Sequence, residues 1–351
     1  MLKKLVCAFC FIISTFEVSA DKGEYYNTLV HIERNMLNGN DYVQQQLKEL
    51  QKHQAKFTPL EKDFYQLLSA HHDYLLSNLY ACKEKAKVLI KETNSIDIKA
   101  KANILLATAE HVLGNHVDSF IALDKAVTAV PDLTRQRYKA SILQAAVGIY
   151  QQAELFEFAL ELARNLQVEA RKLKHGEYLC IANYELGLIE RKTGQTKMAK
   201  ERLMQALDYC KNNNSKIFEY GSVIALNQIN AELGEFEKSN QELKKIIQPV
   251  NDIGWKSLIS QLNLAIARNY LGMEGYKQAE EYALVSHKIA NEVGDKRRLE
   301  MAAEILALAY SGMGQKEKAL NYFKQFRELN SQNKIRVRQR KLAYDVARQK
   351  L

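Results

Sequence analysis

The stretch that decides the fold is residues 306–323, LALAYSGMGQKEKALNYF. It contains a Leu-Ala pair at Leu306 and Ala307, a glycine at Gly314 and a small residue at Ala319. Residues of the same kinds return at intervals of 40 residues through most of the preceding chain. A period of this length is the signature of a repeat architecture, so it fixes the fold before any single residue is considered.

Three columns of residues define the repeat. Small side chains at fixed places let two successive helices cross closely, and a glycine between them suits a turn. The columns are Ser119, Ala159, Ala199, Ser239, Ala279 and Ala319; twelve residues earlier Ala107, Val147, Gly187, Asn227, Ala267 and Ala307; and between them Gly114, Glu154, Gly194, Gly234, Glu274 and Gly314.

This pattern resembles the tetratricopeptide repeat (TPR). The last copy, residues 306–323, shows the likeness best, and the copy before it has Ile266, Ala267, Tyr270, Tyr276 and Ala279 at the matching places. The usual unit of that family has about 34 residues, and a 40-residue unit departs from it most simply by a longer second helix. The resemblance implies an all-α fold, a right-handed α-solenoid of antiparallel helix pairs with six repeats over residues 98–330.

Residues 1–20 have the features of a signal peptide. Lys3 and Lys4 precede a short apolar run, and the small residues of a cleavage site stand at positions 18–20. The apolar run is too short to span a bilayer as a mature helix. We expect cleavage before Asp21 and a periplasmic location, with an uncleaved anchor as the alternative.

The segment 21–97 is helical in pattern but out of register with the repeat, so it is expected to form degenerate capping helices. Thr58, Pro59 and Glu61 predict a helix start, because threonine can cap, proline suits the first position and glutamate can reach back. Pro131 and Pro249 are expected to follow the ends of second helices.

Most of the positive charge lies in residues 331–351. This tail carries +6 of the formal net charge of +9, and the chain between residues 21 and 330 carries only +2. The body is therefore not predicted to bind nucleic acid. We expect the tail to be a basic C-terminal helix that continues the last repeat. It would serve as a solvated cap, as a connection to a further segment, or in contact with a membrane or membrane protein.

Three cysteines remain beyond the leader, Cys82, Cys180 and Cys210. An odd number at irregular spacing does not indicate a disulfide framework. Cys180 should open one helix and Cys210 should close its antiparallel partner, so the two could meet at one end of a hairpin. Two buried thiols are the favoured interpretation, and a bridge is the alternative.

The sequence carries no recognisable catalytic, cofactor or metal motif. The eight histidines do not combine with cysteine or carboxylate at ligand spacing, and phosphate-loop and nucleophile-elbow patterns are missing from the sequence. Glu190 stands where TPR proteins often place an aromatic, and it is interpreted as a helix-surface residue. We therefore expect a protein that is not an enzyme and needs no cofactor.

A helical solenoid offers a concave groove, which in TPR proteins is lined by the first helices. Carried onto this register, the resemblance places polar and aromatic side chains and two arginines there, and these suit peptide recognition. Leu264 falls on the same predicted face. The candidate partner-binding residues are Gln144, Gln151, Tyr184, Arg191, Gln228 and Arg268.

The expected function is an exported, non-catalytic TPR scaffold that binds a protein or peptide, in periplasmic sensing or signal transduction. The stretch from Arg340 to Asp345 resembles the helix that joins periplasmic TPRs to the output part of TPR-GGDEF signalling proteins. This sequence has no GGDEF motif, and no glycine follows Gly314. The alternatives are a truncated sensory part of a membrane TPR-GGDEF diguanylate cyclase, or an envelope or secretion assembly factor.

Overall fold

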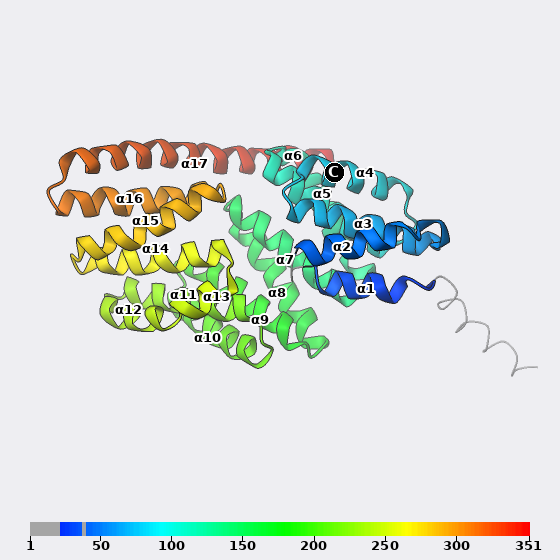
Figure 1. The fold of residues 1–351 in the computed structure, drawn as a ribbon, viewed down its shortest axis with the longest axis horizontal. Coiled ribbons are helices and arrows are strands. Elements are labelled where there is room, and N and C mark those ends of the chain that lie inside the picture. Colours follow the sequence, from blue (N-terminus) through cyan, green and yellow to red (C-terminus); the bar gives the residue numbers. More distant parts are fainter. Residues whose placement is uncertain (1–21, 37–39) are drawn as a thin grey trace, which may run out of the picture. The chain divides into compact units, whose positions relative to one another are not determined.

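The computed structural model describes residues 22–36 and 40–351, and over these residues the regular structure is helical (Figure 1). The predicted leader peptide lies outside the described residues and stays a prediction. The α-helices are α1 (Tyr26–Arg34), α2 (Asn40–Gln51), α3 (Pro59–Leu75), α4 (Leu79–Glu92), α5 (Ile96–Leu113), α6 (His116–Thr128), α7 (Gln136–Gln152), α8 (Phe156–Lys172), α9 (Gly176–Lys192), α10 (Thr196–Asn212), α11 (Lys216–Glu232), α12 (Phe236–Lys245), α13 (Ile247–Ile253), α14 (Lys256–Gly272), α15 (Tyr276–Glu292), α16 (Lys296–Gly312) and α17 (Lys316–Lys350). Two short 3-10 helices cover Gln54–Lys56 and Val130–Asp132.

The chain forms two compact units, which are described separately. Unit 1 comprises residues 1–145 and 343–351, and unit 2 comprises residues 146–342. Within each unit, successive helices pack on one another as antiparallel pairs, which confirms the predicted α-solenoid. Among the described helices, none combines the length and the apolar character that crossing a bilayer requires.

The two columns of small residues form the close contacts inside the helix pairs. Ala267 and Ala279 belong to one buried cluster of unit 2. A Cβ atom added at Gly187 would lie 2.6 Å from Cγ of Leu203, so glycine is needed for this approach. Where the column holds serine, its hydroxyl donates to the carbonyl of the small residue twelve positions earlier, from Ser119 to Ala107 at 2.8 Å and from Ser239 to Asn227 at 2.9 Å.

The turn between the paired helices has one backbone conformation throughout. The predicted turn column, including Glu154 and Glu274, has positive φ angles between 55° and 87°. A second column of left-handed residues closes the turns between pairs, at Lys174, Asn214, Gly254 and Gly294. A left-handed residue lets the chain reverse directly after a helix, and glycine reaches it without the Cβ clash that other residues meet.

The predicted start of α3 is confirmed. The Thr58 hydroxyl accepts from the Glu61 backbone N–H at 3.2 Å, and the Glu61 carboxylate accepts from the Thr58 N–H at 2.9 Å. This reciprocal pair is a capping box, and it satisfies two backbone donors at the helix end.

The prediction for Pro249 was wrong, whereas Pro131 does follow α6 within a 3-10 turn. Pro249 lies inside α13, and the helix is interrupted at Ile246, between α12 and α13. Proline has no N–H to donate, so it is tolerated in the first turn of a helix but interrupts one that would run through it. The interruption therefore begins a new short helix here.

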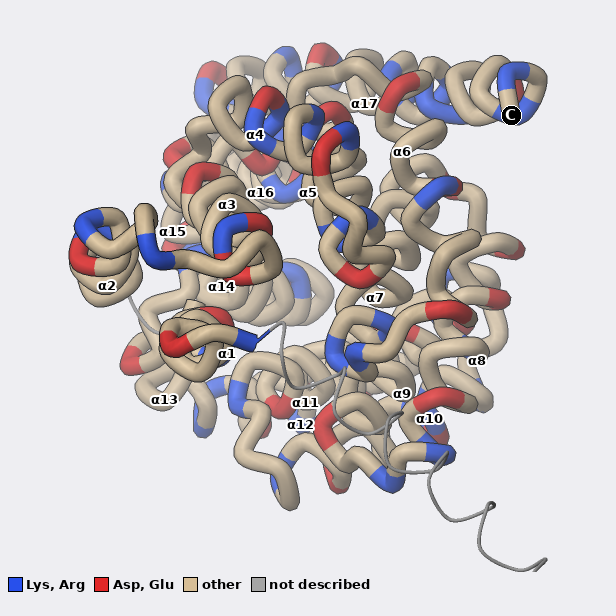
Figure 2. Tube along the Cα trace, turned by 90° about the vertical axis from the view of Figure 1, so that its right-hand side faces the viewer, with Lys and Arg blue, Asp and Glu red and all other residues tan. Residues whose placement is uncertain are grey.

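At the C-terminus, α17 runs without a break from Lys316 to Lys350 and includes most of the basic tail. Figure 2 shows Lys and Arg recurring toward its C-terminal end. In unit 2, Arg340 donates to the backbone carbonyl of Gln152 at 3.0 Å, and Lys341 pairs with Glu154 at 3.7 Å. Part of the tail charge thus neutralises the carbonyl end of α7, where a helix carries partial negative charge.

Candidate functional site

The candidate site is a surface of unit 2 built from the first helices of successive pairs, α9, α11, α14 and α16, with the end of α7. Tyr184 on α9 lies close enough to Gln261 on α14 and Arg298 on α16 that both lower the pKa of its phenol. Because the pairs stack in chain order, first helices that are not neighbours can meet only if the array curves toward this face. We call this the inner polar surface, which consists of Gln151, Tyr184, Glu185, Arg191, Gln228, Glu232, Gln261 and Arg298.

The Tyr184 ring is packed against α11. Its edge faces the Phe218 ring with centroids 5.5 Å apart. A Cβ atom added at Gly221 would lie 3.0 Å from the Tyr184 hydroxyl oxygen. The glycine therefore leaves room for the Tyr184 ring to pack against the backbone of α11. Burial, followed by the neighbouring Glu185 charge, raises the pKa of Tyr184, which keeps the phenol a neutral hydrogen-bond donor.

Glu185 follows directly on α9. Its carboxylate accepts from the side-chain amide of Gln151 at 2.7 Å. Burial raises the pKa of Glu185 to about 7, against the opposing effects of Gln151 and Lys192. The group can therefore accept or release a proton near neutral pH, and its charge depends on what covers the surface.

Arg191 connects the next pair of helices. Its guanidinium donates through Nη1 to the side-chain oxygen of Gln228 and through Nε to Glu232 at 3.1 Å. An ion pair at a partly exposed position, such as Arg191–Glu232, contributes little free energy. A ligand can therefore replace Glu232 as the partner of Arg191 with little loss of stability. The planar guanidinium can then present the same donors to a carboxylate or to peptide carbonyls.

The structure brings four of the six predicted site residues into this surface, namely Gln151, Tyr184, Arg191 and Gln228. Arg268 is exposed on α14, and among the described residues it makes no hydrogen bond or ion pair. Gln144 lies on the part of α7 that belongs to unit 1. The placement of Leu264 on the groove was wrong, because its side chain is 4% exposed and packs in the apolar core of unit 2.

Sequence reasoning missed Glu185, Gln261 and Arg298. For Glu185 a signal existed, because the equivalent positions of the other repeats are all apolar, at Leu105, Ala145, Ala225, Ala265 and Ile305. A carboxylate in a column of apolar residues marks an environment that differs from the other repeats. No comparable pattern distinguishes Gln261 or Arg298.

The interpretation of Glu190 as a surface residue was also wrong. Its side chain is 1% exposed, and its carboxylate lies 3.7 Å from the guanidinium of Arg202 on α10. Burial raises the pKa of Glu190, and the Arg202 charge opposes that effect. Position 190 faces α10, the second helix of the pair, and the long side chain of Arg202 covers the Glu190 carboxylate.

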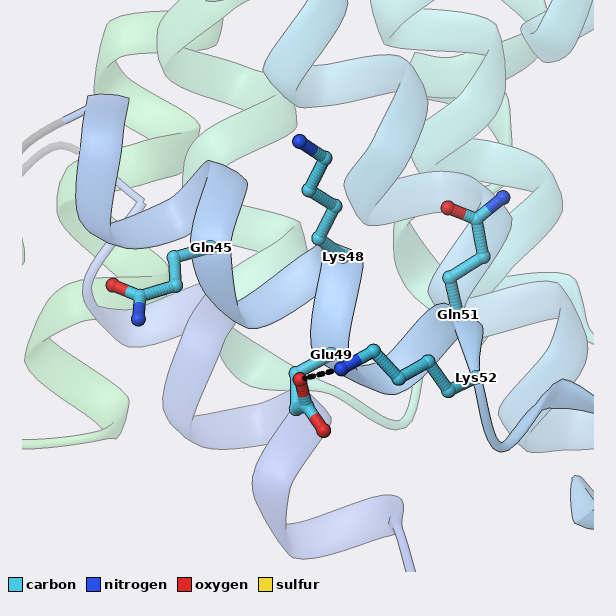
Figure 3. A pocket seen from close by; sticks show the side chains of 5 residues that line it. All are labelled: Gln45, Lys48, Glu49, Gln51 and Lys52. Carbon is cyan, nitrogen blue, oxygen red and sulfur yellow. Dashed lines mark hydrogen bonds and ion pairs between the residues drawn. The ribbon is translucent and has the colours of Figure 1, made fainter.

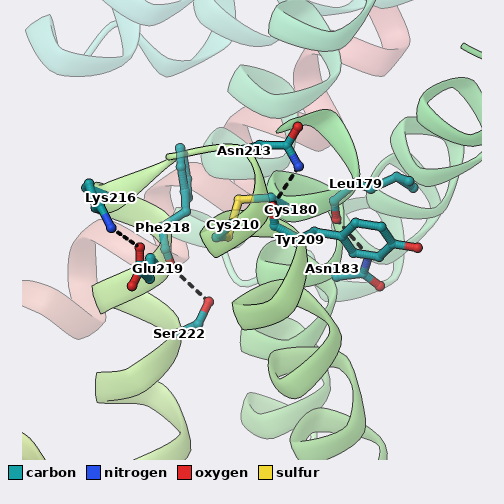
Figure 4. The surroundings of a disulfide bond; sticks show 10 residues. All are labelled: Leu179, Cys180, Asn183, Tyr209, Cys210, Asn213, Lys216, Phe218, Glu219 and Ser222. Atoms are coloured by element: carbon teal, nitrogen blue, oxygen red, sulfur yellow. Dashed lines mark hydrogen bonds and ion pairs between the residues drawn. A yellow bond between two sulfur atoms is a disulfide. The ribbon is translucent and has the colours of Figure 1, made fainter. Parts of the chain in front are cut away.

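Cys180 and Cys210 form a disulfide, so the preference for two free thiols was wrong (Figure 4). Their Cα atoms are 4.9 Å apart, because one residue opens α9 and the other closes α10 at the same end of the hairpin. Cys82 stays a buried free thiol. The bridge joins α9, which carries three residues of the inner polar surface, covalently to its partner helix.

Two shallow hollows lie outside the inner polar surface. The one in Figure 3 is lined by Gln45, Lys48, Glu49, Gln51 and Lys52, and its polar contact is the exposed Lys52–Glu49 ion pair of 2.6 Å. These residues lie along α2 and directly after its end at Gln51, so no second element converges on the hollow. The part of the chain that the structure describes holds no cluster of three or more histidine, cysteine or acidic residues that could bind a metal ion.

No protein-family model matches the sequence, and no curated protein matches it either. Solved structures do share the fold. A Rap protein complexed with Competence and Sporulation Factor is 12% identical, with a TM-score of 0.63 over 91% of this chain and 99% of that chain. NprR in complex with its cognate peptide NprX is 17% identical, with a TM-score of 0.59 over 87% of each chain.

A third similar structure contains a tetratricopeptide repeat sensor. It is a signal transduction ATPase with a tetratricopeptide repeat sensor from Pyrococcus horikoshii, 16% identical, with a TM-score of 0.54 over 88% of this chain and 49% of that chain. At such identities these likenesses establish the fold. The chain is a TPR-like α-solenoid.

Proposed function

We propose that this chain is an exported, non-catalytic scaffold whose inner polar surface binds a peptide segment of another protein, in periplasmic sensing or signal transduction. One observation carries the proposal. The Gln151–Glu185 and Arg191–Gln228 hydrogen bonds join polar side chains of α7, α9 and α11, and Tyr184 of α9 interacts with Gln261 of α14 and Arg298 of α16. These groups complement the N–H and C=O groups of a peptide backbone.

Two neighbours of the same fold support a peptide as the ligand. The Rap structure holds Competence and Sporulation Factor, and the NprR structure holds the peptide NprX. A face that curves around its ligand buries an extended segment on several helices at once, which a flat surface cannot do.

The proposed location rests on two independent features. The first 20 residues have the charge, apolar run and small-residue end of a secretory leader. The Cys180–Cys210 disulfide agrees with this, because structural disulfides persist in oxidising compartments such as the periplasm.

The binding proposal is tested with the intact mature chain and a display library of random peptides. Peptides enriched on the wild-type protein are then measured against the triple variant Tyr184→Ala, Arg191→Ala, Arg298→Ala by fluorescence anisotropy. We expect the affinity to fall roughly tenfold or more, since aromatic and arginine side chains dominate such contacts. The matched control is Arg171→Ala, an exposed arginine on the second helix α8, which should bind as the wild type does.

Equal binding by wild type and triple variant, with helicity retained by circular dichroism, would remove the inner polar surface from the proposal. Fractionation of the host with an antibody against residues 98–330 tests the location. A soluble periplasmic band supports a free binding protein. A larger membrane-bound band would point to a longer membrane-anchored signalling chain, and stoichiometric recovery with an envelope complex to an assembly factor.

A further inference from the structure

The outer face of α17 in unit 2 forms a long exposed stripe. Its members recur at spacings of three and four residues, with adjacent pairs at 323–324 and 334–335, which places them on one side of an α-helix. All of them are exposed. We call this set the α17 stripe, and it consists of Leu320, Phe323, Lys324, Arg327, Ser331, Lys334, Ile335, Arg338 and Leu342.

The stripe combines large apolar side chains with cations. The exposed fractions are 52% for Leu320, 48% for Phe323, 53% for Ile335 and 56% for Leu342. Four of the other five members are Lys or Arg, and none is acidic. The opposite side of the helix is the packed one, as the buried Leu329 shows. The apolar residues of the stripe are therefore not part of the core of unit 2.

The segment of α17 that carries this face has a large excess of positive charge. Between Lys318 and Leu342 the chain holds eight Lys and Arg residues, and Glu328 is the one acidic residue. The cations that the fold uses lie elsewhere on the helix. Arg336 donates to Asn333, Arg340 to the Gln152 carbonyl, and Lys341 pairs with Glu154.

From these observations we propose that the α17 stripe binds the surface of an anionic phospholipid bilayer. Lys and Arg near an acidic lipid surface each contribute about 1 kcal/mol, and apolar side chains between them can enter the boundary between headgroups and acyl chains. A helix of 23 residues from Leu320 to Leu342 is roughly 35 Å long, so it can lie along the bilayer surface.

A second copy of the chain fits this face less well. Two α17 stripes placed against each other would bring four cations of one copy to four cations of the other, with Glu328 as the one neighbouring carboxylate on each copy. Like charges in a desolvated contact are unfavourable, whereas lipid phosphates supply the missing negative charge.

The test is sedimentation of the intact mature chain with vesicles of phosphatidylethanolamine and phosphatidylglycerol, compared with vesicles of phosphatidylcholine alone. We expect binding to the anionic vesicles that weakens as salt is raised. Arg327→Glu with Arg338→Glu should reduce the partition coefficient roughly tenfold or more. Lys197→Glu with Lys200→Glu, two exposed lysines of α10, is the matched control and should bind as the wild type does.

A second variant separates a lipid surface from other polyanions. Ile335→Ser with Leu342→Ser keeps every charge, so it should weaken vesicle binding while leaving binding to heparin unchanged. Failure of the wild type to sediment with anionic vesicles, or equal sedimentation of the charge variant and the wild type, would overturn the proposal. So would a dimer in light scattering that the Ile335→Ser, Leu342→Ser variant abolishes, because the stripe would then be an interface between copies.

Discussion

The Glu185 carboxylate on α9 accepts a 2.7 Å hydrogen bond from the side-chain amide of Gln151 on α7. Two consecutive first helices are thereby joined through an acid that is half-buried and carries a pKa of about 7. The contact links the repeat register, the inner polar surface and the response of the fold to pH.

Replacement of Glu185 by glutamine should flatten part of the pH dependence of stability. The folded-state pKa is raised by burial from about 4.5 to about 7, so the folded protein binds the proton more tightly than the unfolded chain does. The free energy of unfolding of the wild type should therefore fall as pH rises between these values. Urea unfolding across this window should show the fall in the wild type and a smaller one in Glu185→Gln. Glu161→Gln, an exposed acid on α8, should keep the wild-type slope.

Removal of the disulfide should destabilise unit 2. Cys180→Ala with Cys210→Ala releases a constraint between residues 30 apart in the sequence, which costs about 3–4 kcal/mol in the chain-entropy model. Denaturant unfolding of the wild type with and without reductant should give the same difference. Cys82→Ala supplies the control: it keeps the bridge, so reductant should lower its stability by the same amount as in the wild type. A reductant effect of equal size in the double variant would contradict this assignment.

Loss of Arg135 should loosen the N-terminal helix of unit 1. Its guanidinium lies 4.3 Å from the Phe64 ring centroid and donates to the hydroxyls of Tyr26 and Tyr138. Arg135→Ala should cost about 2–3 kcal/mol, because cation–π contacts and buried hydrogen bonds disappear together. Limited proteolysis should then cleave near α1 sooner. Arg135→Lys should also lose stability, since ammonium lacks the planar donor fork. If Arg135→Ala resists proteolysis as well as the wild type does, apolar packing alone holds α1 in place.

A glycine at position 274 should stabilise the fold. Glu274 occupies the turn column with φ of +58°, a conformation that costs a residue with a side chain roughly 1 kcal/mol. Glu274→Gly should raise the free energy of unfolding by about that amount, and Gly234→Ala at the equivalent place should lower it. Thermal unfolding of the two variants in parallel checks the sign. A loss of stability in Glu274→Gly would mean that the flexibility of glycine in the unfolded chain outweighs the relief.

The architecture was readable from the sequence because repetition averages out local ambiguity. Ala267 and Ala279 are small at the same two places as their counterparts, so the helix crossing they imply rests on six copies rather than one. Pro249 was misread for the opposite reason. Proline is compatible with the end of one helix and with the first turn of the next, and a single residue does not separate the two.

Prediction of the site was less complete, because the surface is made by the curvature of the array. The repeat register placed Tyr184 and Arg191 on first helices, and the TPR resemblance then predicted that both side chains face the groove. Gln261 and Arg298 reach Tyr184 only once several repeats are stacked, and the angle between repeats is not encoded in any one of them. The state of Cys180 and Cys210 likewise depended on the exact approach of two helix ends.

The disulfide also has a mechanical consequence. In a linear array of helix pairs, a pulling force applied at the two ends is carried from one repeat to the next, and each repeat that opens lengthens the chain. The disulfide prevents the 30 residues between Cys180 and Cys210 from contributing to that extension. At about 3.3–3.6 Å per extended residue, the oxidised chain should stop roughly 100 Å short of the reduced one when stretched.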